Sequence, residues 1–188
     1  MSDRQKTILE AAAQCIARNG VRGLRVHDVA NQAGVSTSLL YYHFKDREGL
    51  LAATLEHING TASDYRLAGP VGATALERLE AHLLGEIQDV DQVWANSVAW
   101  NELRASAVFE PEIAGPLAQT TAVWNGDITA LIEAVQTEDG LATDTDARKA
   151  AIVLTALVEG LSGRWLTGEL DAEEARQLLR DSIRNLIS

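Results

Sequence analysis

The sequence predicts an all-α protein of about nine helices, and three observations support this. Apolar residues recur at helical spacing almost throughout, as in the run from Ile8 to Ile16. No stretch alternates apolar and polar residues as a strand does. Glycines, prolines and capping pairs divide the chain at regular intervals. We expect a small N-terminal domain over residues 1–50 and a larger helical domain over residues 51–188.

The first part of the chain is expected to form three short helices and a longer fourth one. The first helix should end at a glycine, because glycine readily adopts the left-handed conformation that follows a helix. A second glycine, Gly34, should stop the second helix in the same way. The expected ranges run up to Asn19-Gly20, over about 26–33, over about 36–44, and from after Asp46 to near Gly69-Pro70.

Five further helices are expected in the larger domain. Thr74 with Glu77, and Asp171 with Glu174, have the spacing of a capping box, which marks a helix start. The last two helices carry more apolar surface than one helix pair needs, which favours a four-helix bundle formed with a second copy. The expected ranges are about 74–90, 91–109, 116–136, 144–167 and 171–186.

Composition limits the classes of protein to which the chain can belong. Its single cysteine, Cys15, excludes an intramolecular disulfide framework and a cysteine-rich metal site. No apolar run approaches the roughly 20 residues of a membrane span. The N-terminus, Met1 to Lys6, does not have the pattern of a signal peptide. We therefore expect a cytoplasmic protein without a cofactor, a metal or a membrane partner.

Charge is distributed unevenly along the chain. The whole chain has a formal net charge of -11. Residues 1–50 hold seven Lys or Arg against five Asp or Glu, a balance of +2, which leaves -13 on the remaining residues. DNA would repel the acidic part and favour approach by the N-terminal part.

The second and third predicted helices have the features of a helix-turn-helix. Such a motif needs a small residue where the helices touch, a glycine at positive φ in the turn and an apolar residue beneath it. Ala30 or Ala33, Gly34 and Val35 supply these features. Ser36 is placed to cap the third helix, which is the helix that enters the major groove in such motifs.

The third helix is too short to bury a core alone, so its outward side chains are candidates for DNA contact. Leu40 and Phe44 should face inward, while Tyr41 could be core or contact. Hydroxyl and backbone N–H groups at the start of the helix can hydrogen-bond to phosphates or base edges. The basic residues nearby can contact the phosphates of the DNA backbone. As alternatives to DNA contact, His43 could pack against the core, and the basic residues could be solvated charges without a partner. The predicted DNA-binding residues are Arg25, Ser36, Thr37, Ser38, Tyr41, Tyr42, His43, Lys45 and Arg47.

About 45 residues in this region resemble the signature of the TetR family of regulators. The family often has Thr or Ser as the cap of the second helix, where this chain has Arg25, so that helix should begin less firmly. The resemblance implies a homodimer with two recognition helices about one DNA turn apart on a near-palindromic operator. It also implies a small-molecule effector that releases the DNA, and most relatives are repressors. The matching segments are Val29-Ala30, Ala33-Gly34-Val35-Ser36, Leu40-Tyr41-Tyr42-His43-Phe44 and Lys45-Asp46-Arg47-Glu48-Gly49-Leu50.

Four tryptophans, all in the larger domain, are candidates for an effector pocket. Aromatic faces with an acidic neighbour can bind a cation, including quaternary ammonium. This part of the chain also has a looser resemblance to the choline-responsive BetI branch, in the helix that carries Trp94, the Pro111-Glu112 break and Trp124. The alternative is that the tryptophans are core residues. The predicted pocket residues are Trp94, Trp100, Asn101, Arg104, Trp124 and Trp165.

Two other classes of protein remain open. An all-helical metal-dependent enzyme could use His82 and Glu86, at i and i+4 of one predicted helix, although solvated helix-face residues explain this pair better. A helical interaction module would lack the salt-dependent DNA affinity of a DNA-binding protein. The chain has no nucleophile motif, phosphate-binding glycine loop or matching metal-ligand set. We therefore do not expect an enzyme.

Overall fold

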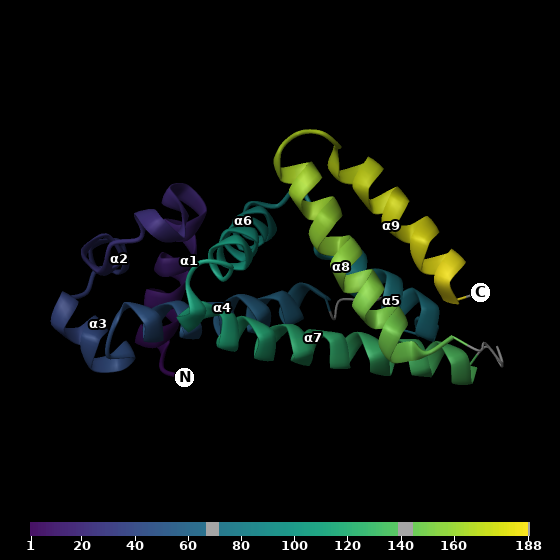
Figure 1. Cartoon of the computed structure of the whole chain (residues 1–188), viewed down its shortest axis with the longest axis horizontal. Helices are drawn as coiled ribbons and strands as arrows, with labels where there is room; N and C mark the ends of the chain where they lie inside the picture. Colours follow the sequence, from purple (N-terminus) through teal and green to yellow (C-terminus); the bar gives the residue numbers. More distant parts are fainter. Residues whose placement is uncertain (67–71, 139–144, 188) are drawn as a thin grey trace. The chain divides into compact units, whose positions relative to one another are not determined.

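The computed structural model describes residues 1–66, 72–138 and 145–187, and these form nine α-helices and no strand (Figure 1). The predicted all-α class is therefore confirmed. None of the described helices is long and apolar enough to cross a membrane. The helices are α1 (Asp3–Gly23), α2 (Val26–Ala33), α3 (Thr37–Phe44), α4 (Arg47–Arg66), α5 (Ala75–Leu84), α6 (Asp91–Ser106), α7 (Pro111–Glu138), α8 (Ala147–Leu166) and α9 (Ala172–Ile187).

The α1 helix is interrupted at the glycine where the sequence predicts a helix end. Gly20 leaves the helical conformation, with φ 71° and ψ 168°, but a further turn of helix follows up to Gly23. The Leu24 N–H then donates to the Val21 carbonyl at 3.1 Å and closes this turn. Gly20 is therefore a bend within α1, and the first helical segment ends there, as predicted.

Two helices of the larger domain also differ from their predicted bounds. The α5 helix ends at Leu84, before the predicted end near residue 90, and Gly85 follows as its cap. The α7 helix begins at Pro111, before the predicted start at Pro116. Proline suits the first helical position because its missing N–H would have no partner there. The predicted helix end near Gly69-Pro70 lies outside the described residues.

The chain forms two compact units. Unit 1 comprises residues 1–61 and 95–120, and unit 2 comprises residues 62–94 and 121–188. The core of unit 1 joins buried side chains of α1 to α4 with Ala99, Leu103, Ile113 and Leu117. Unit 1 is larger than the predicted domain 1–50, because these later residues supply apolar surface that the first helices need.

Unit 2 is organised around α5, α8 and α9, which pack on one another (Figure 1). Both predicted capping boxes are confirmed. The Thr74 hydroxyl and the Glu77 carboxylate each accept the other's backbone N–H, at 3.2 and 2.8 Å. Asp171 and Glu174 exchange the same two bonds at 2.8 and 3.0 Å.

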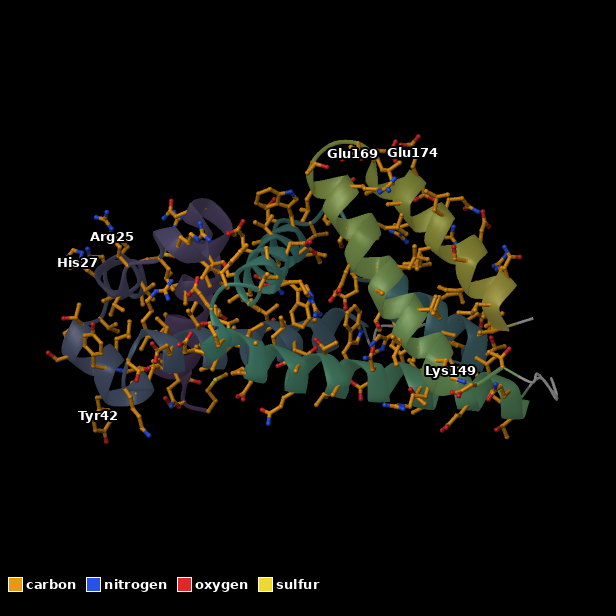
Figure 2. The ribbon with its side chains drawn as sticks, in the orientation of Figure 1. Arg25, His27, Tyr42, Lys149, Glu169 and Glu174 are labelled. Atoms are coloured by element: carbon orange, nitrogen blue, oxygen red, sulfur yellow. The ribbon has the colours of Figure 1, made fainter. Side chains whose placement is uncertain are left out.

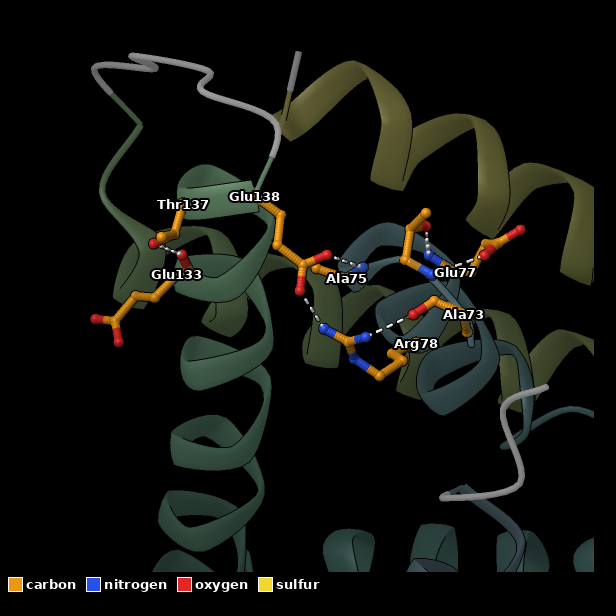
Figure 3. Close-up of polar contacts among 8 residues, drawn as sticks. Ala73, Ala75, Glu77, Arg78, Glu133, Thr137 and Glu138 are labelled. Atoms are coloured by element: carbon orange, nitrogen blue, oxygen red, sulfur yellow. Dashed lines mark hydrogen bonds and ion pairs between the residues drawn. The ribbon is translucent and has the colours of Figure 1, made fainter. Parts of the chain in front are cut away.

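Glu138 joins the end of α7 to the start of α5 (Figure 3). Its carboxylate pairs with the Arg78 guanidinium at 2.7 Å and accepts the Ala75 N–H at 2.7 Å. Arg78 also donates to the Ala73 carbonyl at 2.6 Å, which fixes its position. The hydrogen bond from Arg78, followed by the one from Ala75, holds the pKa of Glu138 below its usual value.

Glu138→Gln is expected to make thermal stability less sensitive to acid. A carboxyl group with a lowered folded pKa stabilises the fold above its unfolded pKa, and this contribution disappears as the pH falls through the folded pKa. The unfolded pKa of Glu is about 4.3, so melting temperatures measured from about pH 7 to about pH 3 test this. Glu133→Gln is the matched control, because Glu133 is exposed on the same helix and gives its backbone carbonyl to Thr137. Equal pH dependence in the parent and in Glu138→Gln would contradict the expectation.

Candidate nucleic-acid interface

The helices α2 and α3 are joined by the turn that the sequence predicts. Gly34 has φ 66° and ψ 33°, a left-handed conformation that residues with a side chain rarely adopt. The Val35 N–H donates to the Ala30 carbonyl at 2.9 Å and closes the turn. The Ser36 hydroxyl accepts the Leu39 N–H at 3.2 Å and caps α3. These bonds define the position of α3 against α2.

The α2 helix begins without a side-chain cap. Arg25 occupies the cap position in an extended conformation and makes no capping hydrogen bond, as predicted. Its exposed side chain is therefore available to another partner. Figure 2 shows Arg25 and His27 pointing away from α2. His27 is not among the predicted residues, since a single polar residue in a short amphipathic helix gives no distinct signal.

One face of α3 presents polar and aromatic side chains to solvent. Thr37, Ser38, Tyr41 and Tyr42 stand at i, i+1, i+4 and i+5, so they share this face. Tyr42 is 80% exposed and Tyr41 48% exposed, and Figure 2 shows Tyr42 pointing away from the helix. Tyr41 is therefore not a core residue. We call these four residues the α3 face.

The opposite side of α3 is anchored in the core of unit 1. Leu40 and Phe44 are buried, which confirms the inward positions predicted for them. His43 is half-buried and lies edge-on to Tyr42, with ring centroids 5.2 Å apart. This packing orients the Tyr42 ring at the end of the α3 face.

A strained turn ends α3 at Lys45. Among the described residues it is the only one other than glycine with a positive φ, and its angles are φ 66° and ψ -59°. The Asp46 N–H donates to the Phe44 carbonyl at 2.8 Å, which makes this a γ-turn of the rare positive-φ form. Such strain costs about 1–3 kcal/mol and concentrates at functional sites. The turn places the exposed Lys45 directly after the α3 face.

Replacing Lys45 should separate the strain of this turn from the role of its ammonium group. Lys45→Gly should be more stable than Lys45→Ala by about 1 kcal/mol, because glycine adopts positive φ without strain. Inside a helix the order of stability is the opposite, with alanine more stable than glycine. If the ammonium group contacts a phosphate, both variants should lower the salt slope of DNA binding by about 0.9. Denaturant melts and binding titrations at several salt concentrations test the two effects, and a slope unchanged in both variants would remove Lys45 from the interface.

The start of α4 lies directly after the γ-turn at Lys45. Asp46 accepts the Gly49 N–H at 2.7 Å through a carboxylate oxygen and so caps α4. A Cβ atom added at Gly49 would lie 2.2 Å from the Phe44 carbonyl oxygen, which is far closer than two such atoms can approach. Glycine is therefore required at this position by a close backbone approach.

Arg47 is engaged within unit 1. Its guanidinium donates to the Val21 carbonyl at 2.7 Å and pairs with the Glu110 carboxylate at 3.1 Å. The predicted grip on the DNA backbone is not supported by this position. No local pattern indicates these partners, because Val21 and Glu110 lie far from Arg47 along the chain.

Three of the six predicted pocket residues lie on α6 in unit 1. The Arg104 guanidinium lies over the Trp100 ring, 5.5 Å from its centroid. The Asn101 amide donates to the Ser97 carbonyl at 2.9 Å. Trp100 can thus hold a cation on its face, and the protein's own arginine occupies that position here.

The other three predicted pocket residues lie in unit 2. Trp124 and Trp165 are buried, and the Trp165 indole N–H donates to Asp89 at 3.3 Å. Their burial favours a core position for these two rings. Trp94 is 45% exposed and is therefore the most accessible of the three.

The pair His82 and Glu86 does not have the environment that we expected. Both side chains are buried, so their interpretation as solvated helix-face residues is wrong. They do not share one helix either, since α5 ends at Leu84 and Glu86 follows it. Within the described part of the chain, no group of three or more His, Cys, Asp or Glu residues could hold a metal ion.

Two family models match most of the chain. Residues 8–54 match "Bacterial regulatory proteins, tetR family", and residues 75–188 match "BetI-type transcriptional repressor, C-terminal". Among curated proteins, the chain is similar to the HTH-type transcriptional regulator BetI of Klebsiella pneumoniae strain 342, with 27% identity over 183 residues, 96% of this chain and 89% of the relative. It is similarly related to BetI of Cronobacter sakazakii, with 28% identity over 194 residues, 98% of this chain and 91% of the relative.

Solved structures agree with these matches. A putative TetR-family transcriptional regulator from Rhodococcus sp. is 52% identical, with full coverage of both chains and a TM-score of 0.96. A putative transcriptional regulator from Saccharomonospora viridis, solved in complex with choline, is 28% identical over 98% of this chain and 97% of its own, with a TM-score of 0.81.

Proposed function

Because the chain belongs to the TetR family of bacterial transcription regulators, we propose that it binds a near-palindromic DNA operator as a homodimer and releases it when a small molecule binds. Residues 1–50 would bind the DNA, while residues 51–188 would provide dimerisation and effector binding. The role is that of a repressor in the cytoplasm, and no enzymatic activity is part of the proposal.

The α3 face is the observation that carries the DNA-binding part of the proposal. At the capped start of this helix Ser38 is exposed and Thr37 is half-buried, and backbone N–H groups and the helix dipole favour phosphate there. Tyr42 extends furthest into solvent. Arg25 and Lys45 are exposed on the same motif and can add phosphate contacts. With only a small positive balance in this region, binding would depend on the fit of two such motifs to one operator.

Exposed apolar side chains on α8 and α9 support the homodimer. Ile152 and Val153 on α8 and Leu178 on α9 are each about half exposed, at 44%, 53% and 49%. Two helix pairs from two copies can bury such residues in a four-helix bundle. The dimer would also supply the second recognition helix that a near-palindromic operator requires.

For the effector we propose an organic cation of the quaternary ammonium type. The choline complex of the related Saccharomonospora viridis protein supports this choice. So does the charge of -13 outside the first 50 residues, which attracts cations. The candidate pocket residues are Trp100, Asn101 and Arg104 within unit 1 and, separately, Trp94, Trp124 and Trp165 within unit 2.

Selection of genomic fragments by the full chain, followed by release with a ligand, tests this proposal. Choline should release the selected duplex, whereas its neutral isostere 3,3-dimethylbutanol should not, because only the charged form gains from aromatic faces and carboxylates. If no fragment is retained even at low salt, DNA binding itself is refuted. If fragments are retained but choline and its isostere act alike, only the cationic effector is refuted.

A further inference from the structure

The backbone N–H and carbonyl groups of Val21 are both bound by charged side chains. The Val21 N–H donates to the Glu102 carboxylate of α6 at 3.2 Å. The Val21 carbonyl accepts from the Arg47 guanidinium at 2.7 Å, and Arg47 in turn pairs with Glu110 at 3.1 Å. We call Arg47, Glu102 and Glu110, together with the Val21 backbone that they hold, the Val21 clamp. All four residues belong to unit 1.

The bend at Gly20 is what makes the Val21 N–H available. A helical N–H normally bonds to the carbonyl four residues earlier, and Gly20 interrupts this pattern with its φ of 71°. Val21 is fully buried, so its N–H needs another partner, which Glu102 supplies. A Cβ added at Gly20 would lie 2.7 Å from the same Glu102 carboxylate oxygen. The bend and the carboxylate therefore fit each other.

The clamp acts on the segment that leads into the helix-turn-helix. Only Arg22, Gly23 and Leu24 separate Val21 from Arg25, which occupies the cap position before α2. Glu102 and Arg47 hold the Val21 backbone at the start of this short segment, and Leu24 is buried at its end. Any loosening of the clamp would first change the position of the start of α2. Through the Gly34 turn it would then change the position of α3.

We propose that the Val21 clamp positions the helix-turn-helix for operator binding, and that Arg47, Glu102 and Glu110 are positioning residues that do not themselves contact DNA. This inference rests on the proposed function. Binding of a specific operator requires two recognition helices to meet their half-sites together, so a small error in orientation weakens it. Binding of unrelated DNA depends on phosphate charge alone and tolerates such an error.

The Glu110→Gln variant provides the sharpest test, because a role through charge and a role in positioning predict opposite changes in operator affinity. If Glu110 acted only through its negative charge, its removal would strengthen binding to DNA, which is also negative. The clamp predicts weaker operator binding, because a neutral amide holds the Arg47 guanidinium against Val21 less firmly than the carboxylate does. Glu112→Gln is the matched control, since Glu112 is an exposed acidic residue two positions away in the first turn of α7.

The experiment measures the affinity of the full chain for its selected operator and for an unrelated duplex of equal length, at several salt concentrations. Glu110→Gln should weaken operator binding by about 3- to 10-fold, the effect expected when one hydrogen bond loses its charged acceptor, with an unchanged salt slope. Its affinity for the unrelated duplex should not change. Glu112→Gln should bind the operator as tightly as the parent or slightly more tightly. An equal loss on both duplexes would overturn the positioning role.

Arg47→Lys provides a second variant that keeps the charge. A lysine ammonium cannot reproduce the forked geometry that joins Val21 and Glu110, so this variant should lose operator affinity at an unchanged salt slope. If Arg47 instead contacted a phosphate, lysine would keep that contact, so operator affinity equal to that of the parent would overturn the positioning role. If Glu110→Gln fails to fold, Arg47→Lys decides the question.

The outcomes also separate the clamp from the function on which it rests. A parent chain that selects no operator refutes the proposed function. A parent that binds its operator, together with a folded Glu110→Gln that binds equally well or more tightly, refutes the clamp alone.

Discussion

Replacing Gly49 with alanine should strongly destabilise the fold. The added Cβ would lie 2.2 Å from the Phe44 carbonyl oxygen, and that oxygen is fixed by the γ-turn at Lys45. Relief requires the backbone to move, at a cost of about 3 kcal/mol. For a chain of this size the melting temperature should fall by about 6–12 °C, measured by circular dichroism.

Gly60→Ala is the matched control, because Gly60 lies further along the same helix. A Cβ added there meets no described atom within 4 Å, and the residue is exposed. Alanine is preferred over glycine inside a helix by about 0.5–1 kcal/mol, so this variant should melt slightly above the parent. The two substitutions in α4 should thus act in opposite directions. If Gly49→Ala were as stable as Gly60→Ala, the close approach at Gly49 would be refuted.

Tyr42→Ala should have the largest effect on operator binding. The side chain is 80% exposed, so its loss leaves the core of unit 1 intact. Its ring lies edge-on to that of His43, with centroids 5.2 Å apart. We expect a loss of about 1–3 kcal/mol in operator binding, with the dimer and the melting temperature unchanged. Binding titrations, together with sedimentation of the free protein, measure both quantities.

Tyr42→Phe shows which part of the side chain is responsible. If the hydroxyl group donates to a phosphate or a base, this variant should lose most of the same binding energy. If the ring makes apolar contact, the variant should bind like the parent. Operator affinity that is unchanged in Tyr42→Ala would remove Tyr42 from the interface.

The helix-turn-helix could be predicted from the sequence because its determinants are local. Gly34, Val35 and Ser36 lie next to one another and their bonds span at most five residues. The burial of Leu40 and the exposure of Tyr42 follow from helical spacing alone. The lack of a side-chain cap at Arg25 follows from the residue type.

The Val21 clamp could not be predicted, because its bonds join residues distant in sequence. Glu102 lies 81 positions from Val21, and Glu110 lies 63 positions from Arg47. A basic residue after α3 indicates a DNA contact when only its neighbours are considered. The inward position of Arg47 becomes visible only once α6 and the start of α7 are packed against α1.

The bounds of α5 and the burial of His82 and Glu86 could not be predicted for a related reason. Apolar spacing continues past Gly85, so the sequence offers no clear end to the helix there. In the structure the Gln88 amide donates to the Gly85 carbonyl at 2.6 Å, a bond that belongs to a turn. The burial of polar residues such as His82 and Glu86 depends on tertiary packing, which a local apolar pattern does not contain.

Footprinting of the selected operator by the full chain tests the central claim most directly. A homodimer that presents two α3 faces should protect two half-sites related by a dyad, with centres about one helical turn or 10 base pairs apart. Tyr42→Ala should abolish both protected regions at the same protein concentration. A single unsymmetrical protected region, or protection that survives in Tyr42→Ala, would contradict the assignment of α3 as the DNA-reading helix.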